Sequence, residues 1–211
     1  MVKMGFPNVA IQWVDLMLRG TQIQAKCHGH CTPLMQVPTG LAQGSPLSPL
    51  LWVLAAQPLS SRLRQLQQSA QIGAIPLPDG TPAPPCHQHA DDTTLHTDTA
   101  ESAAVAIAEA VQPFARASNS KLNISKSHGM GLGPLATMSG MHQGTRVEFT
   151  TQPLRHLGIM MGHNEAEAAA AMYDKRRGAV YGAIRTWAPL ALSAIGRQYV
   201  AKSVVASTLY Y

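Results

Sequence analysis

Cysteine is scarce in this sequence, and long apolar runs are absent from it. The chain of 211 residues holds three cysteines, which are too few and too irregularly spaced for the disulfide framework of a small secreted domain. No stretch approaches the ~18 apolar residues of a membrane span, and the segment after Lys3 lacks the apolar core of a secretory signal. These absences predict a nuclear or cytoplasmic protein that is not secreted and has no membrane partner.

Positive charge is missing from one internal segment. Residues 71–110 carry six acids and no Lys or Arg, although the net charge of the whole chain is +5 and its pI is about 9.3. Basic flanks around an acidic centre favour a polyanionic partner, and nucleic acid is the commonest such partner. The apolar content of 45% is that of a globular chain, and the length suits one domain of ordinary size or one domain with a small appendage.

The acidic segment contains a pair of adjacent carboxylates, Asp91 and Asp92, between short β-prone residues. The strand-like stretch over residues 93–97 predicts that the pair occupies the tip of a hairpin, which holds both side chains forward. Two adjacent ionised carboxylates repel each other, so a folded chain keeps them where water or an oxygen-preferring divalent cation compensates their charge. A solvated turn without chemistry is the alternative interpretation.

A second informative stretch covers residues 39–51. Gly40 and Gly44 free the backbone for close approach to a ligand, and Pro46 is expected at the first position of a helix that continues through Leu63. A glycine loop that leads into a helix N-terminus suits phosphates or a nucleotide. The spacing matches neither a Walker loop nor a dinucleotide fingerprint, so the pattern alone defines no function.

Hydropathy periods and turn residues predict the other elements. A buried amphipathic helix is expected over residues 7–18, a hairpin over residues 22–37 and a turn over residues 78–81. The C-terminal half should add a strand after residues 121–127, a hairpin from residues 146–149 and 154–161, and helices over residues 165–187 and 192–211. The last two helices carry basic residues that favour phosphate binding, namely Lys175, Arg176, Arg177, Arg185, Arg197 and Lys202.

The helix after the acidic hairpin carries its own start and stop signals. Asp98 and Glu101, three residues apart, predict a capping box at its start. Pro113 is expected to kink this helix or to end it early. Asn119 is expected to end it in the left-handed conformation.

The turn at residues 27–31 combines cysteine and histidine in a pattern that invites a zinc interpretation, and residues 86–89 repeat the two residue types. Structural zinc sites use pairs spaced as C-x2-4-C and H-x3-5-H. Three residues separate Cys27 from Cys31, but no second pair repeats that spacing. An exposed turn is therefore the preferred interpretation.

Five blocks stand in a fixed order along nearly the whole chain. They are G-L-A-Q-G-S-P-L-S-P at residues 40–49, A-D-D at 90–92, K-L-N-I-S-K-S at 121–127, H-L-G-I at 156–159 and L-S-A-I-G-R at 192–197, the last preceded by Trp187. They resemble the G-x-x-Q-G-x-P-L-S-P, Y/F-A-D-D, K-L-N-x-x-K-S, Y-L-G-I and L-S-x-x-G-R blocks of the reverse transcriptase domain of non-LTR (LINE-type) retrotransposons.

This resemblance implies an α+β fold in which an incomplete right-hand polymerase palm, a ferredoxin-like sheet with helices on one face, precedes a helical thumb segment. Residues 1–134 would form the partial palm, residues 135–162 a primer-grip hairpin and residues 163–211 the start of the thumb. The implied activity is RNA-directed DNA synthesis, in which deoxynucleoside triphosphates extend a DNA primer on an RNA template. Two Mg²⁺ or Mn²⁺ ions support that reaction in the complete enzyme.

The resemblance also assigns roles to individual residues. Asp91 and Asp92 would be the catalytic metal ligands, and Lys126 would lie near the triphosphate as a proton donor. The residues expected against the incoming nucleotide and the template are Gln43, Gly44 and Pro46. The residues expected under the primer terminus, as the primer grip, are His156, Leu157 and Gly158.

One block of the family has no counterpart in this sequence. The family places a further metal-binding Asp in an F-x-x-A-F/Y-D strand before the helix expected at residues 7–18, and residues 1–14 contain no acid. Loss of one carboxylate removes charge stabilisation on which phosphoryl transfer depends. We therefore expect a partial reverse transcriptase, inactive alone, whose upstream part belongs to the same polyprotein. The alternatives are a non-catalytic nucleic-acid-binding remnant and an α+β globule without function.

Overall fold

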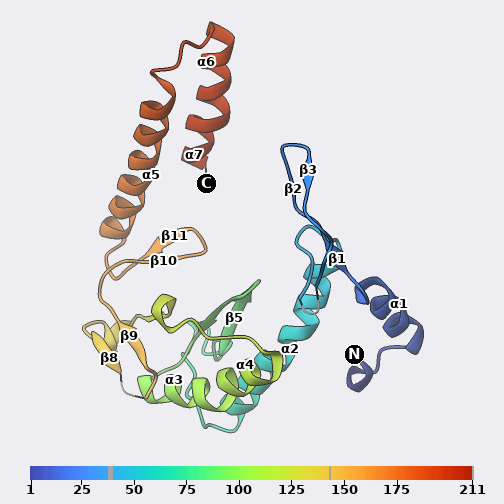
Figure 1. The fold of residues 1–211 in the computed structure, drawn as a ribbon. Coiled ribbons are helices and arrows are strands. Elements are labelled where there is room, and N and C mark those ends of the chain that lie inside the picture. The colour runs from blue at the N-terminus through green and yellow to red at the C-terminus, as the bar shows by residue number, and fades with distance from the viewer. Residues whose placement is uncertain (38–39, 143, 211) are drawn as a thin grey trace. The chain divides into compact units, whose positions relative to one another are not determined.

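The computed structural model describes residues 1–37, 40–142 and 144–210 (Figure 1). Its contacts divide the chain into two compact units, Met1–Lys121 and Leu122–Tyr211, which we describe one at a time. Helices and small sheets occur together, so the predicted α+β class is confirmed. The strands of the described residues form five separate sheets of two or three strands, and the single ferredoxin-like sheet is not formed by them.

The first unit contains helices, two short strand pairs and one longer hairpin. Its elements are η1 (Val2–Met4), α1 (Asn8–Leu18), β1 (Gln22–Ile23), β2 (Lys26–Cys27), β3 (His30–Cys31), β4 (Met35–Gln36), α2 (Ser48–Gln68), β5 (Cys86–His89), β6 (Asp92–Leu95), α3 (Ala100–Ala106), the π-helix η2 (Ile107–Val111) and α4 (Gln112–Ser118). β1 pairs with β4 and β2 with β3, so the hairpin predicted over residues 22–37 is confirmed.

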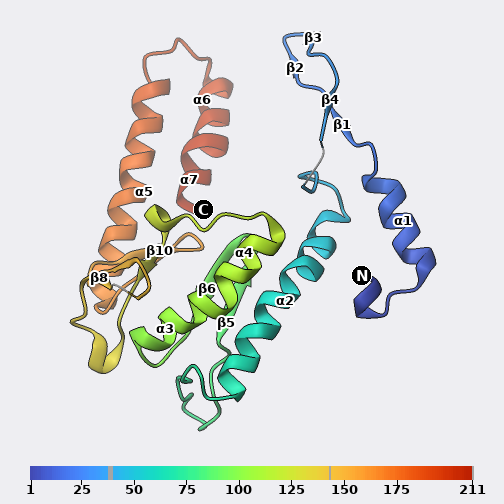
Figure 2. The same cartoon turned by 60° about the horizontal axis from the view of Figure 1, so that its bottom comes forward.

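The core of the first unit lies between α2 and the α3–η2 segment, which run side by side (Figures 1 and 2). Leucines at helical spacing on α2 face alanines of the opposite helix, and Ile72 packs beside them; the cluster is Leu59, Leu63, Leu66, Ile72, Ala106 and Ala110. Small alanine side chains let the helices approach closely, and each buried leucine contributes about 1.5–3 kcal/mol. Cys86 and Leu95 of the β5–β6 hairpin pack against the same cluster, which fixes the hairpin on the helices.

Pro113 shapes the helix that follows the hairpin. Proline has no N–H to donate to the carbonyl of Glu109, four residues earlier, and the turn before Pro113 widens into the π-helix η2. Arg62 of α2 uses that carbonyl: its Nε donates to the oxygen of Glu109 at 3.3 Å, and its Nη2 lies 3.6 Å from the Glu109 carboxylate. Asn119 then ends the helix with a φ of 55°, so the predicted left-handed stop is confirmed.

The predicted capping box at the start of this helix is wrong. The cap is Thr99, whose side-chain oxygen accepts a hydrogen bond from the backbone N–H of Ser102 at 3.1 Å. Asp98 instead accepts from the hydroxyl of Ser102 at 2.6 Å. The polar residues thus act one position later than expected, because a threonine directly before the first helical residue takes the capping position.

Helix α1 forms where the apolar period predicts it, but its predicted burial is wrong. The apolar stripe is exposed, with exposed fractions of 63% at Val9, 60% at Trp13 and 69% at Leu16. Arg19 and Asp15 form an ion pair at 2.5 Å that joins the last turn of the helix to the residue after it. Periodicity predicts that an apolar stripe exists, but burial needs a partner surface.

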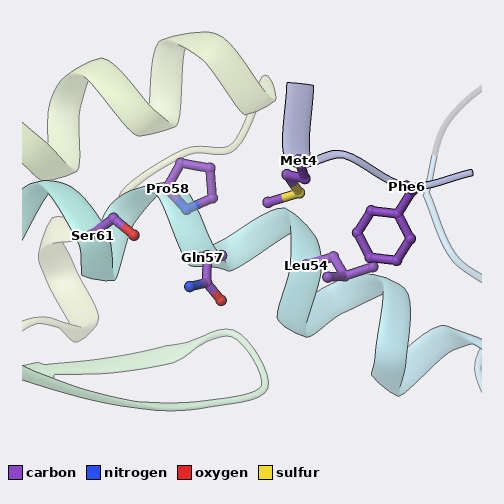
Figure 3. A pocket seen from close by; sticks show the side chains of 6 residues that line it. All are labelled: Met4, Phe6, Leu54, Gln57, Pro58 and Ser61. Carbon is purple, nitrogen blue, oxygen red and sulfur yellow. The ribbon is translucent and has the colours of Figure 1, made fainter. Parts of the chain in front are cut away.

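A shallow cavity of about 480 Å³ lies along one side of α2 (Figure 3). Met4 and Phe6 from the N-terminal segment lie over this side of the helix, beside Leu54 and Pro58. The remaining lining residues, Gln57 and Ser61, are uncharged, so no ionisable side chain lines the cavity. We assign no chemistry to it.

The second unit combines small sheets with a helical pair. Its elements are η3 (Ile124–Lys126), β7 (His128–Gly129), η4 (Gly133–Leu135), β8 (Gly140–His142), β9 (Val147–Phe149), β10 (Leu154–His156), β11 (Ile159–Met161), α5 (Glu165–Trp187), α6 (Ala194–Val200), the π-helix η5 (Ala201–Ala206) and α7 (Ser207–Tyr210). The α6–α7 segment packs back along α5 (Figure 1), which confirms the two predicted C-terminal helices; Tyr211 lies outside the described residues.

The hairpin predicted from residues 146–149 and 154–161 is wrong in its pairing. β9 pairs with β7 and β8, whereas β10 pairs with β11. A two-residue turn joins β10 to β11, and both of its residues, Leu157 and Gly158, have positive φ values of 47° and 89°. Such a turn matches the twist of two directly connected strands, which explains why β11 folds back on β10.

The core predicts a large difference between two leucines of α2. Leu63→Ala should lower the free energy of unfolding by about 2–5 kcal/mol, because Leu63 is fully buried and its loss leaves a cavity. Leu50→Ala, in the same helix at 65% exposure, should change it by less than about 0.5 kcal/mol. Urea unfolding followed by circular dichroism measures both values, and equal losses would contradict this description of the core.

Candidate functional site

The β5–β6 hairpin presents the two adjacent carboxylates. Its strands pair antiparallel from Cys86 opposite Leu95 to His89 opposite Asp92. Ala90 and Asp91 form the turn, and Asp92 is the first residue of β6. Both aspartates are exposed, so the predicted position of the pair at a hairpin tip is confirmed.

The turn is anchored to α2 through its backbone. The indole N–H of Trp52, a half-buried residue of α2, donates a hydrogen bond to the carbonyl oxygen of Ala90. Ala90 has a φ of 50°, in the left-handed region that favours glycine. Ala90, directly before Asp91, therefore combines a strained backbone conformation with a hydrogen bond from Trp52 of α2.

The two faces of the hairpin have different environments. Cys86 and Leu95 face the core, and burial raises the pKa of the Cys86 thiol, although the positive charge of Arg64 partly opposes this shift. His87 and His89 alternate with the inward residues of β5 and are exposed. The hairpin that carries the carboxylate pair thus has an apolar face packed on the core and a polar face exposed to solvent.

The glycine loop leads into the helix that touches this turn. Gln43, Gly44 and Pro46 precede α2, and Gly44 has a φ of 85° that suits glycine. The hydroxyl of Ser48 donates to the carbonyl of Ala42 at 2.7 Å, which closes the loop onto the start of the helix. The predicted helix start at Pro46 is wrong, because the chain makes turns there and α2 begins at Ser48. Trp52, one turn into α2, links this loop to the hairpin.

The other predicted site residues belong to the second unit. Lys126 ends η3, His156 ends β10, and Leu157 and Gly158 form the β10–β11 turn, where Leu157 is 50% exposed. The structure therefore gathers Gln43, Gly44, Pro46 and the aspartates in one unit and the remaining four residues in the other. Their roles stay predictions.

The two carboxylates are candidate metal ligands. Oxygen donors such as those of Asp91 and Asp92 suit Mg²⁺ or Mn²⁺. Across the described residues, however, no three His, Cys, Asp or Glu side chains come together in a way that would hold a metal ion. The two aspartates thus fit one oxygen-preferring cation, and the described chain adds no third protein ligand. Residues 27–31 form the exposed β2–β3 turn that the sequence favours.

An exposed aspartate pair on a hairpin tip, anchored to the helix that follows a glycine loop, is an arrangement suited to divalent-ion chemistry on phosphates. Residues 2–161 match the family model described as "Reverse transcriptase (RNA-dependent DNA polymerase)". The match covers more than half of the chain, which therefore belongs to the reverse transcriptase family. The family acts on nucleic-acid template and primer with nucleotide substrates, and generally uses divalent metal ions. A comparison with curated proteins found no match.

No helix of the described residues combines the length and the apolar character that crossing a membrane requires.

The strained turn predicts a stabilising substitution. Ala90→Gly should raise the free energy of unfolding by about 0.5–1 kcal/mol, because glycine adopts a positive φ without the steric cost that alanine carries. The matched control is Ala55→Gly at an exposed position of α2, where glycine should lower stability by about the same amount. Thermal and urea unfolding measure both. A destabilised Ala90→Gly variant would contradict the positive φ.

Proposed function

We propose that this chain is the palm and the start of the thumb of a reverse transcriptase from a non-LTR retrotransposon. The observation that carries the proposal is the exposed Asp91–Asp92 pair at the tip of β5–β6, within a chain that matches the reverse transcriptase family. The order of the five sequence blocks supports the non-LTR type. The substrates would be an RNA template, a DNA primer and deoxynucleoside triphosphates.

Site roles follow from the same proposal. Asp91 and Asp92 hold a divalent ion, which when bound stabilises the charge that develops in nucleotidyl transfer. Gln43, Gly44 and Pro46 contact the nucleotide and the template, and Lys126 gives a proton to the departing diphosphate. The primer terminus rests on the β10–β11 hairpin, at residues 156–158.

Polymerisation needs more carboxylates than the described residues bring together. The tip of β5–β6 offers two, and a two-ion reaction divides charge neutralisation and positioning among more ligands than that. A further carboxylate from another part of the same polyprotein completes the site. The chain by itself is then a partial enzyme that holds substrates without extending the primer.

The second unit supplies the cations for nucleic-acid binding. Residues 163–211 carry six Lys or Arg and three acids, and Lys175, Arg177 and Arg185 are exposed along α5. Arg177 shares its charge with Asp174 in an ion pair at 3.2 Å, so Lys175 and Arg185 are the better choices for phosphate contacts. Contacts of this kind are independent of sequence and weaken steeply with salt.

A non-catalytic nucleic-acid-binding remnant is the second candidate function. Among the described residues no three possible metal ligands come together, which favours this candidate, because binding through α5 needs no metal ligand. Both candidates bind nucleic acid and neither extends a primer alone; they differ in whether Asp91 and Asp92 serve a catalytic site that another part of the polyprotein completes. The two predictions below test what they share, which is binding without extension by this chain.

The chain should bind a primer–template duplex with an affinity that falls steeply as salt rises. Replacing Lys175 and Arg185 by Gln should reduce the slope of log K against log salt by about 1–2, because each lost phosphate contact releases about one counterion fewer. The control is Lys3→Gln, which removes an exposed cation of the first unit. Fluorescence anisotropy over a salt series measures the slope. An unchanged slope in the double variant would remove α5 from the proposed interface.

Primer extension tests whether this chain is a complete catalyst. Residues 1–211 with an RNA template, an annealed DNA primer, deoxynucleoside triphosphates and Mg²⁺ or Mn²⁺ should give no extended product above background. Asp91→Asn should bind the duplex as tightly as the parent or more tightly, since it removes a negative charge near phosphate. Extension that disappears in Asp91→Asn would show that this chain is a complete catalyst and that the partial-enzyme proposal is wrong.

A further inference from the structure

The outer face of the β5–β6 hairpin carries histidines that the proposed function does not use. His87 lies in β5 opposite Thr94, and His96 directly follows β6, where its backbone N–H donates to the carbonyl of Pro85 at 2.9 Å. The rings of His87 and His96 come together across the two chain segments. Their centroids are 4.8 Å apart and their planes meet at 57°.

This separation suits two ligands of one metal ion. Zinc lies about 2.0–2.1 Å from a ligating imidazole nitrogen, and so about 3.2 Å from the centre of the ring. With one nitrogen of each ring directed at the same ion, centroids 4.8 Å apart correspond to an angle of roughly 100° at the metal, which is close to the tetrahedral value. A tilt of 57° keeps the rings from stacking face to face and leaves their edges available.

The hydrogen bond of His96 fixes which nitrogen is available. Its Nδ1 lies 3.0 Å from the carbonyl oxygen of Pro84. A carbonyl only accepts hydrogen bonds, so Nδ1 carries the proton and the Nε2 lone pair is left for a metal. An imidazole that donates its second nitrogen to a backbone carbonyl is the usual arrangement of metal-ligating histidine, because that bond fixes the tautomer and orients the ring.

We propose that His87 and His96 bind a divalent transition-metal ion of the class that prefers imidazole, such as Zn²⁺, Ni²⁺ or Cu²⁺. The described residues bring no third protein ligand to the pair, and water completes the coordination. His87 is exposed, so the ion enters from solvent. This site is separate from the oxygen ligands of Asp91 and Asp92, which suit Mg²⁺.

A metal at this position joins the two open ends of the hairpin. His87 lies near the start of β5 and His96 follows the end of β6, whereas the aspartates occupy the turn at the other end. An ion held by both histidines ties these ends together only when the hairpin is folded. Binding therefore stabilises the element that presents the aspartate pair, without occupying that pair.

The test is a Zn²⁺ titration of the whole chain in competition with a chromophoric chelator, with Ni²⁺ as a second probe. His87→Gln and His96→Gln should each weaken the tightest Zn²⁺ site at least tenfold. The double variant should lose no more than either single variant, since a site with two protein ligands fails when one is removed. Circular dichroism of each variant verifies that the fold is retained, and the Zn²⁺-dependent rise in melting temperature should disappear in His87→Gln.

Three controls locate the site. His30→Gln tests the exposed β2–β3 turn, which also holds Cys27 and Cys31; His89→Gln tests the neighbouring histidine of the hairpin; and Asp92→Asn tests the carboxylate pair. Each control should keep Zn²⁺ affinity within threefold of the parent. Parental affinity in His87→Gln, or a tenfold loss in any control, would overturn the assignment. Neither outcome bears on primer–template binding, so the proposed function stands or falls separately.

Discussion

The packing of α2 against the α3–η2 segment is the constraint on which the rest of the first unit depends. Leu63 and Leu66 are fully buried against Ala106 and Ala110, and the hairpin that carries the aspartates rests on the same cluster. The position of two of the most polar groups in the chain is thus set by apolar contacts on the opposite face of their own hairpin. Two hydrogen bonds from α2 add to these apolar contacts. The Trp52 indole donates to the turn at Ala90, and Arg62 donates to the carbonyl of Glu109 in the π-helix.

The missing N–H of Pro113 affects how the helix that contains it contacts α2. Because Pro113 cannot donate to the carbonyl of Glu109, the helix widens there and the carbonyl becomes available to a neighbour. Arg62 of α2 donates a hydrogen bond to this carbonyl and also lies near the Glu109 carboxylate. A single proline thus allows a contact between the two helices beside the core. π-helical turns within longer helices often accompany functional sites, and Ala110 of this one belongs to the core cluster on which the hairpin of the proposed site packs.

Local signals in the sequence predicted local features well. The aspartate hairpin, the left-handed stop at Asn119 and the C-terminal helices all follow from residue type and spacing. Features that need a partner distant in sequence were missed. The bond from Trp52 to Ala90 spans 38 residues, and no periodic pattern signals it. The exposure of the α1 stripe was missed for the same reason, since a period shows that a face is apolar but not what covers it.

The strand pairing in the C-terminal half was missed for a local reason, whereas the site roles depend on non-local information. The β10–β11 turn needs positive φ at Leu157, a residue whose type does not suggest it, so the wrong strands were paired. The family match reaches residue 161 and supports the overall activity, while the roles of Lys126 and the β10–β11 hairpin need the placement of one unit against the other.

The alternation along β5 and β6 makes the hairpin far more sensitive to length than to composition. Cys86 and Leu95 point toward the helices while His87, His89 and Asp92 point away, and this division holds only in one register. Inserting or deleting a single residue within either strand would exchange the two faces, sending imidazoles toward the leucine cluster and apolar groups toward water. Natural variants of this segment should therefore differ by substitution while keeping the spacing between Cys86 and Leu95 constant.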